Sequence, residues 1–98
     1  MSLPISFRRA ARAELIEAAA WYEARQPNLG VEFIAEIERC VALAAEQSQR
    51  FGIVHNGIRR VVAARFPYSV YYRAEPRRVV VLAVFHASRN PTAWQRRS

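Results

Sequence analysis

The stretch from residue 59 to residue 97 constrains the fold more than any other part of the chain. It contains three runs rich in Val, Tyr and Phe, at residues 59–64, 67–73 and 78–86. Short turns that contain proline join these runs. Short runs of β-branched and aromatic residues between such turns are typical of β-strands that follow one another in an antiparallel meander.

The run at residues 78–86 is predicted to be an interior strand, because it is apolar on both faces. In the run at residues 67–73, one face is expected to be solvated, and Tyr71 and Tyr72 must point to opposite sides. With regular alternation, the last run would carry Val79, Val81, Ala83 and Phe85 on one face and Val80, Leu82, Val84 and His86 on the other.

Two helices are predicted ahead of these strands. Residues 9–25 contain many alanines and no glycine or proline, which favours a helix. Their apolar stripe includes Leu15 and Tyr22, and Trp21, which borders it, is expected to belong to the core. Residues 31–49 repeat apolar side chains at spacings of three and four, with Phe33 beside the stripe.

The joint between the two helices is short, so we expect an antiparallel helical hairpin. Residues 4–8 alternate apolar and polar side chains and are interpreted as a first short strand, whereas residues 48–57 are expected to form a loop. The predicted order is therefore β-α-α-β-β-β. This is an α+β fold with the helical hairpin packed on one face of a small antiparallel sheet.

Charge is the most informative property of the composition. The chain has 98 residues, enough for one domain over residues 1–98, and its net charge is +7. All 15 basic residues are Arg, and there is no Lys. A GC-rich genome would explain Arg in place of Lys but not the excess of positive charge. Guanidinium groups bind carboxylates and phosphates in a planar, bidentate way, so an acidic protein or a nucleic acid is the expected partner.

Several classes of protein are disfavoured by the sequence. There is no apolar run of the roughly 20 residues that a membrane helix needs and no apolar segment of a secretory signal, so a cytoplasmic protein without a membrane partner is expected. One cysteine, Cys40, provides neither a disulfide framework nor a metal cluster. Without metal-ligand spacing or a glycine-rich phosphate loop, no cofactor is expected.

Four segments in order carry a resemblance to a known family. Residues 14–22 read ELIEAAAWY, and a second helix is predicted after Leu29-Gly30. Residues 66–72 read FPYSVYY after Arg60, and residues 81–94 read VLAVFHASRNPTAW. Over nearly the whole chain, this pattern resembles the RelE/ParE toxin superfamily and in particular its ParE branch, the plasmid stabilisation proteins.

The resemblance implies a bacterial toxin that causes growth arrest and is held inactive by a labile antitoxin encoded beside it. It also implies a helical hairpin on a small antiparallel sheet, which agrees with the order derived above. ParE-like members poison DNA gyrase, and RelE-like members cleave messenger RNA in the ribosome. Because one fold hosts both activities, the fold alone does not choose between them.

The ribonuclease pattern fits this chain poorly, so a toxin that acts by binding gyrase is the favoured reading. RelE-like enzymes use Lys, Arg and a tyrosine near the C-terminus, and here lysine is absent and no tyrosine follows His86. A substitute set for the ribonuclease alternative is Arg65, His86, Arg89 and Tyr72, with Tyr71 in place of Tyr72 as a further choice. Alternatively, His86 has a structural role and hydrogen-bonds the tail backbone.

Two further sets of contacts are predicted. Apolar and aromatic residues of the hairpin are candidates to bind the acidic, amphipathic C-terminal segment of the antitoxin, and arginines of the sheet and tail are candidates to bind the target. Trp94 could instead cover the sheet. The antitoxin set is Leu15, Trp21, Tyr22 and Phe33. The target set is Arg59, Arg60, Arg65, Arg73, Arg89, Trp94, Arg96 and Arg97.

A small basic module that binds nucleic acid is the alternative from a different class. Such a module would need exposed aromatic rings beside its arginines, as proteins that bind single strands have. Tyr71 and Tyr72 are the candidates from the sequence.

Overall fold

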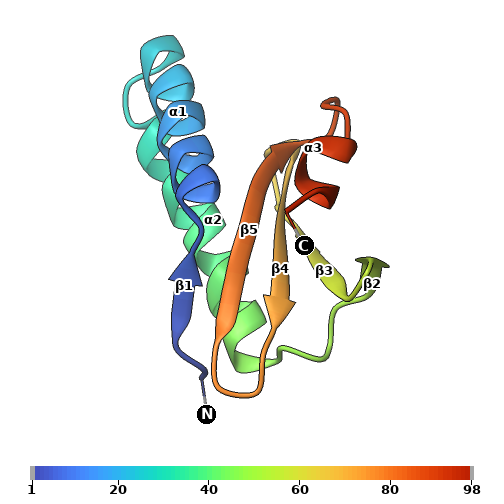
Figure 1. The fold of residues 1–98 in the computed structure, drawn as a ribbon. Helices are drawn as coiled ribbons and strands as arrows, with labels where there is room; N and C mark the ends of the chain where they lie inside the picture. The colour runs from blue at the N-terminus through green and yellow to red at the C-terminus, as the bar shows by residue number, and fades with distance from the viewer. Residues whose placement is uncertain (1, 98) are drawn as a thin grey trace.

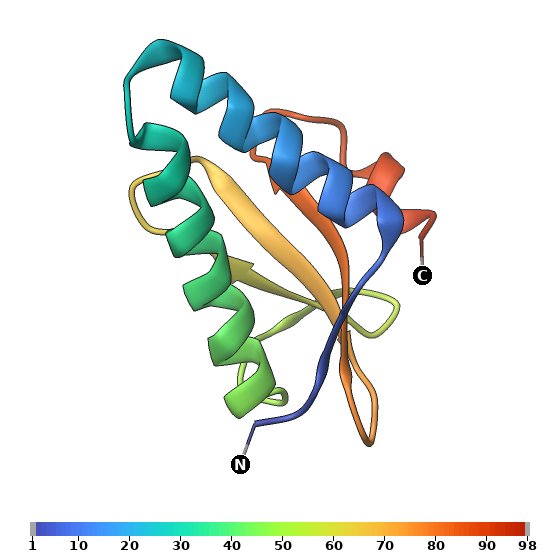
Figure 2. The ribbon, with the colours of Figure 1, turned by 90° about the vertical axis from the view of Figure 1, so that its left-hand side faces the viewer.

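A five-stranded sheet lies at the centre of the molecule, and two long helices cover one of its faces (Figure 1, Figure 2). The computed structural model describes residues 2–97. The predicted fold class, a helical hairpin on a small sheet, is confirmed. The elements are β1 (Ile5–Phe7), α1 (Arg9–Arg25), α2 (Leu29–Glu46), β2 (Ile53–His55), β3 (Ile58–Val62), β4 (Tyr68–Ala74), β5 (Val79–His86) and α3 (Thr92–Gln95).

The sheet differs from the prediction in two ways. The order across the sheet is β1-β5-β4-β3-β2, and β1 pairs with β5 in parallel, so the sheet is mixed. The segment expected to be a loop contains β2, which pairs antiparallel with β3. Asn56 and Gly57 join these strands with φ of 42° and 78°. A two-residue Asn-Gly connection with positive φ at both positions is a strong hairpin signal that the loop prediction overlooked.

Strand β5 is interior and buried on both faces, as predicted, but its faces are divided differently from the regular alternation. Tyr71 pairs with Ala83 and Tyr72 with Val81, so Leu82 is an extra residue in β5. Such a β-bulge shifts all later side chains to the opposite face. Val84 therefore faces the helices, while Leu82, Ala83 and Phe85 belong to the other layer.

The layer between the helices and the sheet is the larger part of the core. Alanines of α1 allow this helix to approach the sheet closely, and α2 contributes Phe33 and Ile37, both fully buried. Phe33 packs edge-on against Phe66 and Tyr68, with ring centroids 5.2 and 4.9 Å apart. Burying such rings contributes most of the hydrophobic stabilisation of a domain of this size.

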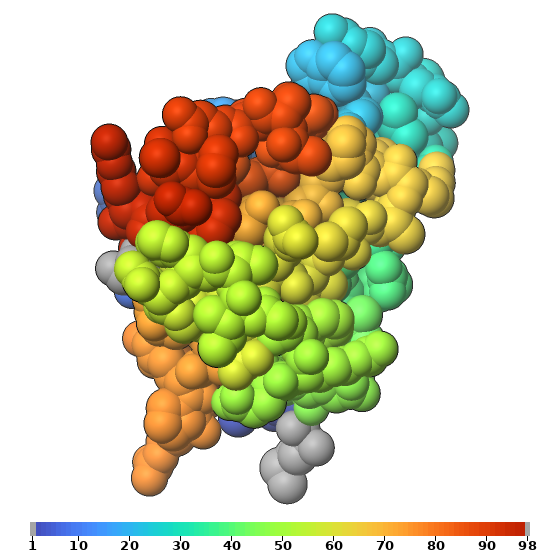
Figure 3. All heavy atoms as spheres, turned by 90° about the vertical axis from the view of Figure 1, so that its right-hand side faces the viewer, coloured from blue at the N-terminus to red at the C-terminus, as the bar shows by residue number. Residues whose placement is uncertain are grey.

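The other face of the sheet is covered by the tail of the chain. Trp94 in α3 is only 4% exposed and stacks on Tyr71, with ring centroids 4.1 Å apart. Phe85 and Ile58 lie in the same cluster. The expectation that one face of β4 is solvated is therefore wrong at Tyr71, because α3 folds back over it. Figure 3 shows this tail side by side with β2 on the outer face.

The turn between the helices is closed by one carboxylate. Glu23 accepts hydrogen bonds from the backbone nitrogens of Asn28 (2.8 Å) and Gly30 (3.0 Å). A Cβ atom at Gly30 would lie 2.4 Å from the carbonyl oxygen of Ala19. Glycine at this position thus lets α1 and α2 cross in close contact. Within residues 2–97, no helix is both long and apolar enough to span a membrane.

Candidate functional site

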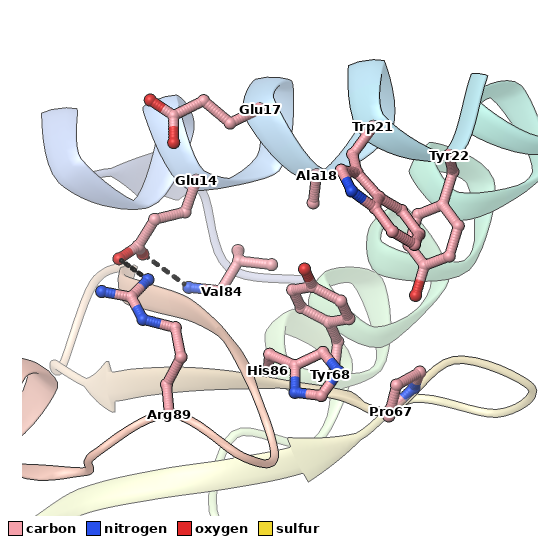
Figure 4. Close-up of a pocket in the computed structure, with 10 residues that line it drawn as sticks. All are labelled: Glu14, Glu17, Ala18, Trp21, Tyr22, Pro67, Tyr68, Val84, His86 and Arg89. Atoms are coloured by element: carbon pink, nitrogen blue, oxygen red, sulfur yellow. Dashed lines mark hydrogen bonds and ion pairs between the residues drawn. The ribbon is translucent and has the colours of Figure 1, made fainter. Parts of the chain in front are cut away.

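A cleft of about 480 Å³ opens between α1 and the adjoining ends of β4 and β5 (Figure 4). Its position follows from the fold, because α1 crosses the sheet above the place where β5 passes into the tail. Aromatic rings form much of its wall, and charged side chains lie along its rim. The residues that line it are Glu14, Glu17, Ala18, Trp21, Tyr22, Pro67, Tyr68, Val84, His86 and Arg89.

Glu14 fixes the tail at one end of the cleft. Its carboxylate accepts two hydrogen bonds from the Arg97 guanidinium, at 2.8 and 3.0 Å, and one from the Val84 backbone nitrogen at 3.0 Å. Arg97 also donates to the carbonyl oxygen of Leu82 at 2.9 Å. A bidentate pair of this kind is among the stronger polar contacts in proteins.

The position of this ion pair is explained by the edge of β5. Strand β1 pairs with β5 only as far as Val81, and Arg8 donates the last backbone hydrogen bond there. Beyond this point, the chain of β1 has turned into α1, and the backbone groups of β5 on that edge need other partners. Glu14 and Arg97 supply them.

His86 lies at the end of β5 on the cleft side. Its Nδ1 accepts a hydrogen bond from the Ser88 backbone nitrogen at 3.0 Å and lies 2.8 Å from the Ser88 hydroxyl oxygen. The predicted structural role, a hydrogen bond to the tail backbone, is thus present. With Nδ1 accepting, the neutral ring carries its proton on Nε2, which has no hydrogen-bond partner among the described residues.

Trp21 is the most exposed aromatic side chain of the cleft, at 53%. The prediction that it belongs to the core is wrong, because this part of α1 extends past the sheet and no strand covers it (Figure 1). The indole is held in place by two neighbours. Tyr22 packs edge-on at 5.1 Å between centroids, and the Arg25 guanidinium lies 3.9 Å from the ring centroid. The latter is a cation–π contact.

The two tyrosines of the cleft are hydrogen-bond donors at neutral pH. Burial raises the pKa of Tyr68 and the pKa of Tyr22 above the ordinary value of 10.0. Figure 4 shows the Tyr68 hydroxyl directed toward α1, into the same space as the indole nitrogen of Trp21. The cleft therefore presents N–H and O–H donors between aromatic walls.

The predicted target-binding set divides into engaged and available side chains. Arg59 donates to the Phe51 carbonyl oxygen at 2.6 Å, Arg65 pairs with Glu32 at 2.7 Å, and Arg97 is bound to Glu14. Trp94 is buried against Tyr71, so the alternative that it covers the sheet is confirmed and its assignment as a surface contact does not fit this structure. By contrast, Arg60, Arg73 and Arg96 make no ion pair with another described residue.

Arg89 is only partly engaged by other residues of the protein. Its guanidinium lies 3.6 Å from the Glu14 carboxylate and 4.0 Å from the Phe85 ring centroid, and its side chain is 52% exposed. Because Arg97 already binds Glu14 in a bidentate way, Arg89 keeps most of its hydrogen-bonding capacity for a partner.

The predicted antitoxin-binding set is also divided. Phe33 is fully buried in the helix–sheet core, so it cannot be a surface contact; the stripe prediction placed it beside the core but not within it. Trp21 and Tyr22 line the first cleft. Leu15 lines a second groove of about 430 Å³ between β1, α1 and α2. Ile5, Phe7, Arg12, Glu38 and Val41 are the other residues of this groove.

The residues proposed for a ribonuclease are not brought together as a set. His86 and Arg89 line the same cleft, but Tyr72 is fully buried and donates its hydroxyl to the Ser48 carbonyl oxygen at 2.9 Å. Arg65 is held by Glu32 on α2. Tyr71 lies beneath Trp94. Tyr68 is the tyrosine that the structure places beside His86, with ring centroids 5.2 Å apart.

Glu14 and Tyr68 are among the cleft residues that sequence reasoning did not select. A signal for Glu14 was present, because residues 14, 18 and 21 repeat at helical spacing and place this carboxylate at the border of the buried stripe. For Tyr68, the pairing with His86 depends on the strand register. Only the bulge at Leu82 brings these two residues opposite each other.

The comparisons with known proteins agree with the fold. The chain superimposes on a solved chain from the chromosomal ParDE system of Pseudomonas aeruginosa with a TM-score of 0.74 and 18% identity, covering 87% of this chain and 96% of that one. It matches a chain of the toxin–antitoxin complex RelBE2 from Mycobacterium tuberculosis with a TM-score of 0.58 and 22% identity, covering 88% and 99%. The comparison with curated proteins gives no match.

The family assignment comes from the sequence profile. The model of the ParE toxin of type II toxin–antitoxin systems, parDE, matches residues 5–91. This range runs from the first residue of β1 to just before α3 and includes every helix and strand that forms the cleft. The resemblance found in the sequence is thereby confirmed, and the chain belongs to the ParE toxin family of type II toxin–antitoxin systems.

Proposed function

We propose that this chain arrests bacterial growth by binding a protein, DNA gyrase, and that a ParD-like antitoxin neutralises it in the cytoplasm. The observation that carries the proposal is the family match over residues 5–91. The net charge of +7 supports an acidic partner. The action is binding rather than chemistry of the toxin's own.

The separation of the candidate catalytic residues supports a toxin without enzymatic activity. A ribonuclease needs a base, an acid and groups that stabilise the phosphate within reach of one bond. Here, Tyr72 is buried and Arg65 is engaged in an ion pair. The ribonuclease remains as the second candidate because His86, Arg89 and Tyr68 line one cleft.

The second groove is the proposed site of the antitoxin. Its floor is apolar, with Phe7, Leu15 and Val41, and Ile5 is 45% exposed at its margin. Arg12 lies at its border, and Arg9 and Arg8 lie three and four residues before it in the chain. None of these three makes an ion pair with another described residue. This combination of an apolar floor and cations without ion pairs suits an acidic, amphipathic segment that folds on binding.

The experiment is a direct comparison of two activities. Purified protein is expected to inhibit DNA supercoiling by gyrase and to leave messenger RNA on translating ribosomes intact. Addition of the protein encoded beside it is expected to restore supercoiling. Cleavage of messenger RNA at codon-defined positions that is lost in His86→Ala or Arg65→Ala would instead establish the ribonuclease.

A further inference from the structure

The cleft beside Trp21 contains an exposed aromatic ring and hydrogen-bond donors that take no part in holding the fold together. We propose that this cleft binds a segment of the toxin's target protein in which an apolar side chain stands next to a carboxylate. The proposal rests on the proposed function, a toxin that acts by binding a protein. It assigns the target contact to α1 and the ends of β4 and β5 instead of the tail.

The indole of Trp21 has the properties of an interface anchor. It is about half exposed, yet contacts with Tyr22 and Arg25 hold it in one orientation. Ordering a side chain before binding lowers the entropy that binding must overcome. Trp is also enriched among the few residues that contribute most of the binding energy at protein interfaces. Trp21 is therefore suited to bury its ring against a partner.

The shape and lining of the cleft suit an apolar side chain with polar groups beside it. Trp21, Tyr22 and Pro67 provide apolar wall, and the volume of about 480 Å³ is sufficient for a large side chain. Tyr68 and His86 offer donors, since neither the Tyr68 hydroxyl nor His86 Nε2 has a partner among the described residues. These donors can bind a backbone carbonyl or a carboxylate that enters with the side chain.

Charge at the rim favours an acidic segment. Arg25 stands at the Trp21 end and makes no ion pair with another described residue. Arg89 stands at the opposite end, 3.6 Å from a Glu14 carboxylate that it shares with Arg97, so Glu14 offsets only part of the positive charge of these two arginines. Glu14 is already bound to Arg97, so Glu17 is the only carboxylate at the rim that lacks a partner within residues 2–97. Three arginines, Arg25, Arg89 and Arg97, therefore face two carboxylates, Glu14 and Glu17, which leaves the rim net positive. The charge of the whole chain attracts the same kind of partner.

A nucleic acid strand fits this cleft less well than a protein segment. Binding of single strands relies on several exposed rings along a cationic groove. Here one ring, Trp21, is substantially exposed, and both Glu14 and Glu17 line the cleft. A strand with a phosphate at every nucleotide would meet these carboxylates, whereas a peptide can place a single carboxylate at Arg25 or Arg89.

The cleft and the proposed antitoxin groove flank α1 on opposite sides of its buried stripe. Trp21 and Glu17 point to one side, and Arg12 and Leu15 to the other. Target binding and antitoxin binding are therefore separable by substitution. This separation is the basis of the experiment.

The first measurement uses Trp21→Ser in the full chain, with Ile16→Ser as the matched control. Ile16 is 61% exposed on the same helix and lines neither cavity. Loss of an interface anchor is expected to weaken growth arrest, so that about tenfold more cells survive expression of the variant. The affinity for the antitoxin is expected to stay within about twofold of the parent's. Ile16→Ser is expected to behave as the parent. Circular dichroism and thermal melting establish that both variants are folded.

Two results would overturn the assignment. One is full growth arrest by folded Trp21→Ser. The other is growth arrest by Trp21→Ser that the antitoxin no longer relieves, which would place the antitoxin in the cleft. A parent protein that arrests no growth would refute the proposed function. In that case, a second measurement decides whether the cleft binds a segment of the proposed kind.

That second measurement selects peptides from a random phage-displayed library on the parent protein. The expected peptides combine an aromatic or aliphatic residue with a neighbouring Asp or Glu, and binding shifts the emission of Trp21 to shorter wavelength. Buried Trp94 serves as an internal reference. Affinity for Trp21→Ser is expected to fall about tenfold. Failure to enrich such peptides, or equal binding to both proteins, would refute the acidic-apolar occupant.

Discussion

The two faces of the sheet are both buried, but they are closed by very different elements. The helix face is covered by α1 and α2, which have 17 and 18 residues. The outer face is closed by the four residues of α3 and by one ring, Trp94. The lesson is that a short tail can complete a hydrophobic layer when a large aromatic side chain and an ion pair hold it in place.

This difference determines how stability is distributed. On the helix face, many apolar contacts share the stabilisation, so the loss of one leaves the layer closed. On the outer face, the tail is attached by a small number of contacts, which include the stacking of Trp94 on Tyr71, the Arg97–Glu14 pair and the contacts of Arg89 with Glu14 and Phe85. Substitutions in the two layers can therefore test the comparison.

The largest effects are expected from the buried rings. Phe33→Ala on the helix face and Trp94→Ala on the outer face should each lower the free energy of unfolding by about 3 to 5 kcal/mol, because each leaves a cavity. Urea denaturation followed by circular dichroism measures both. Val62→Ala, at a side chain 64% exposed, is the control and should change little. A loss below about 1 kcal/mol in Trp94→Ala would mean that α3 is not part of the core.

A smaller effect is expected where the two helices cross. Gly30→Ala places a Cβ atom against the Ala19 carbonyl oxygen and should destabilise by about 2 kcal/mol through overpacking. Gly52→Ala is the matched control, since a Cβ atom there meets no atom within 4 Å. Thermal melting compares the two. Equal melting temperatures of the two variants would indicate that α1 and α2 move apart easily, which would contradict the description of the hairpin as a rigid cover of the sheet.

The hydrogen bonds of Arg97 to Glu14 and to the Leu82 carbonyl oxygen, here called the tail clasp, should contribute less to stability than the buried rings. Arg97→Ala removes three hydrogen bonds and should lower the unfolding free energy by about 1 to 2 kcal/mol. Arg96→Ala, next to it and without an ion pair to a described residue, should stay within about 0.5 kcal/mol. Hydrogen exchange at Val84 should accelerate in Arg97→Ala only. The same exchange rate in both variants would count against the clasp.

The smallest effect concerns acid stability on the helix face. The hydrogen bond from Arg39, with a further one from the Ala64 backbone nitrogen, lowers the pKa of Glu36 from 4.5 to about 2. A lowered pKa in the folded state means that Glu36 stabilises the fold above about pH 4.5 and loses this contribution as the pH falls toward 2.

Because Arg39 is half exposed, solvent screens the pair, and the contribution should be about 1 kcal/mol or less. Glu36→Gln should flatten the decline in unfolding free energy between pH 5 and pH 2, measured by urea denaturation at each pH. Glu46→Gln, at an exposed carboxylate without a described partner, should retain the slope of the parent. A parental slope in Glu36→Gln would show that other groups set the acid response.

Most of the fold was predictable because local signals agreed with one another. Alanine content and the absence of breakers located α1 from Arg9 to Arg25, as observed. The period of apolar residues located α2 to within a few residues. The hairpin of β2 was predictable in principle from Asn56-Gly57, but a run of three residues gives a weak strand signal.

The candidate site was less predictable, since it depends on where elements end relative to one another. The sequence left two interpretations open for each tryptophan, and the structure shows that Trp21 is exposed and that Trp94 covers the sheet. The periodicity of apolar residues does not reveal that α1 extends past the end of the sheet or that the tail folds back over Tyr71. The bulge at Leu82, which decides the face of Val84, is likewise a property of the pairing with β4 and not of either strand alone.

The meeting of distant segments at β5 also has a consequence for the kinetics of folding. The helical hairpin and the meander each close over short stretches, but Glu14 and Arg97 are 83 residues apart, and β1 joins β5 across the whole of the intervening chain. Contacts of such high sequence separation slow folding, because the chain must lose loop entropy before they form. Contacts that close after the rate-limiting step slow unfolding without speeding folding, so Arg97 is expected to act mainly on the lifetime of the native state.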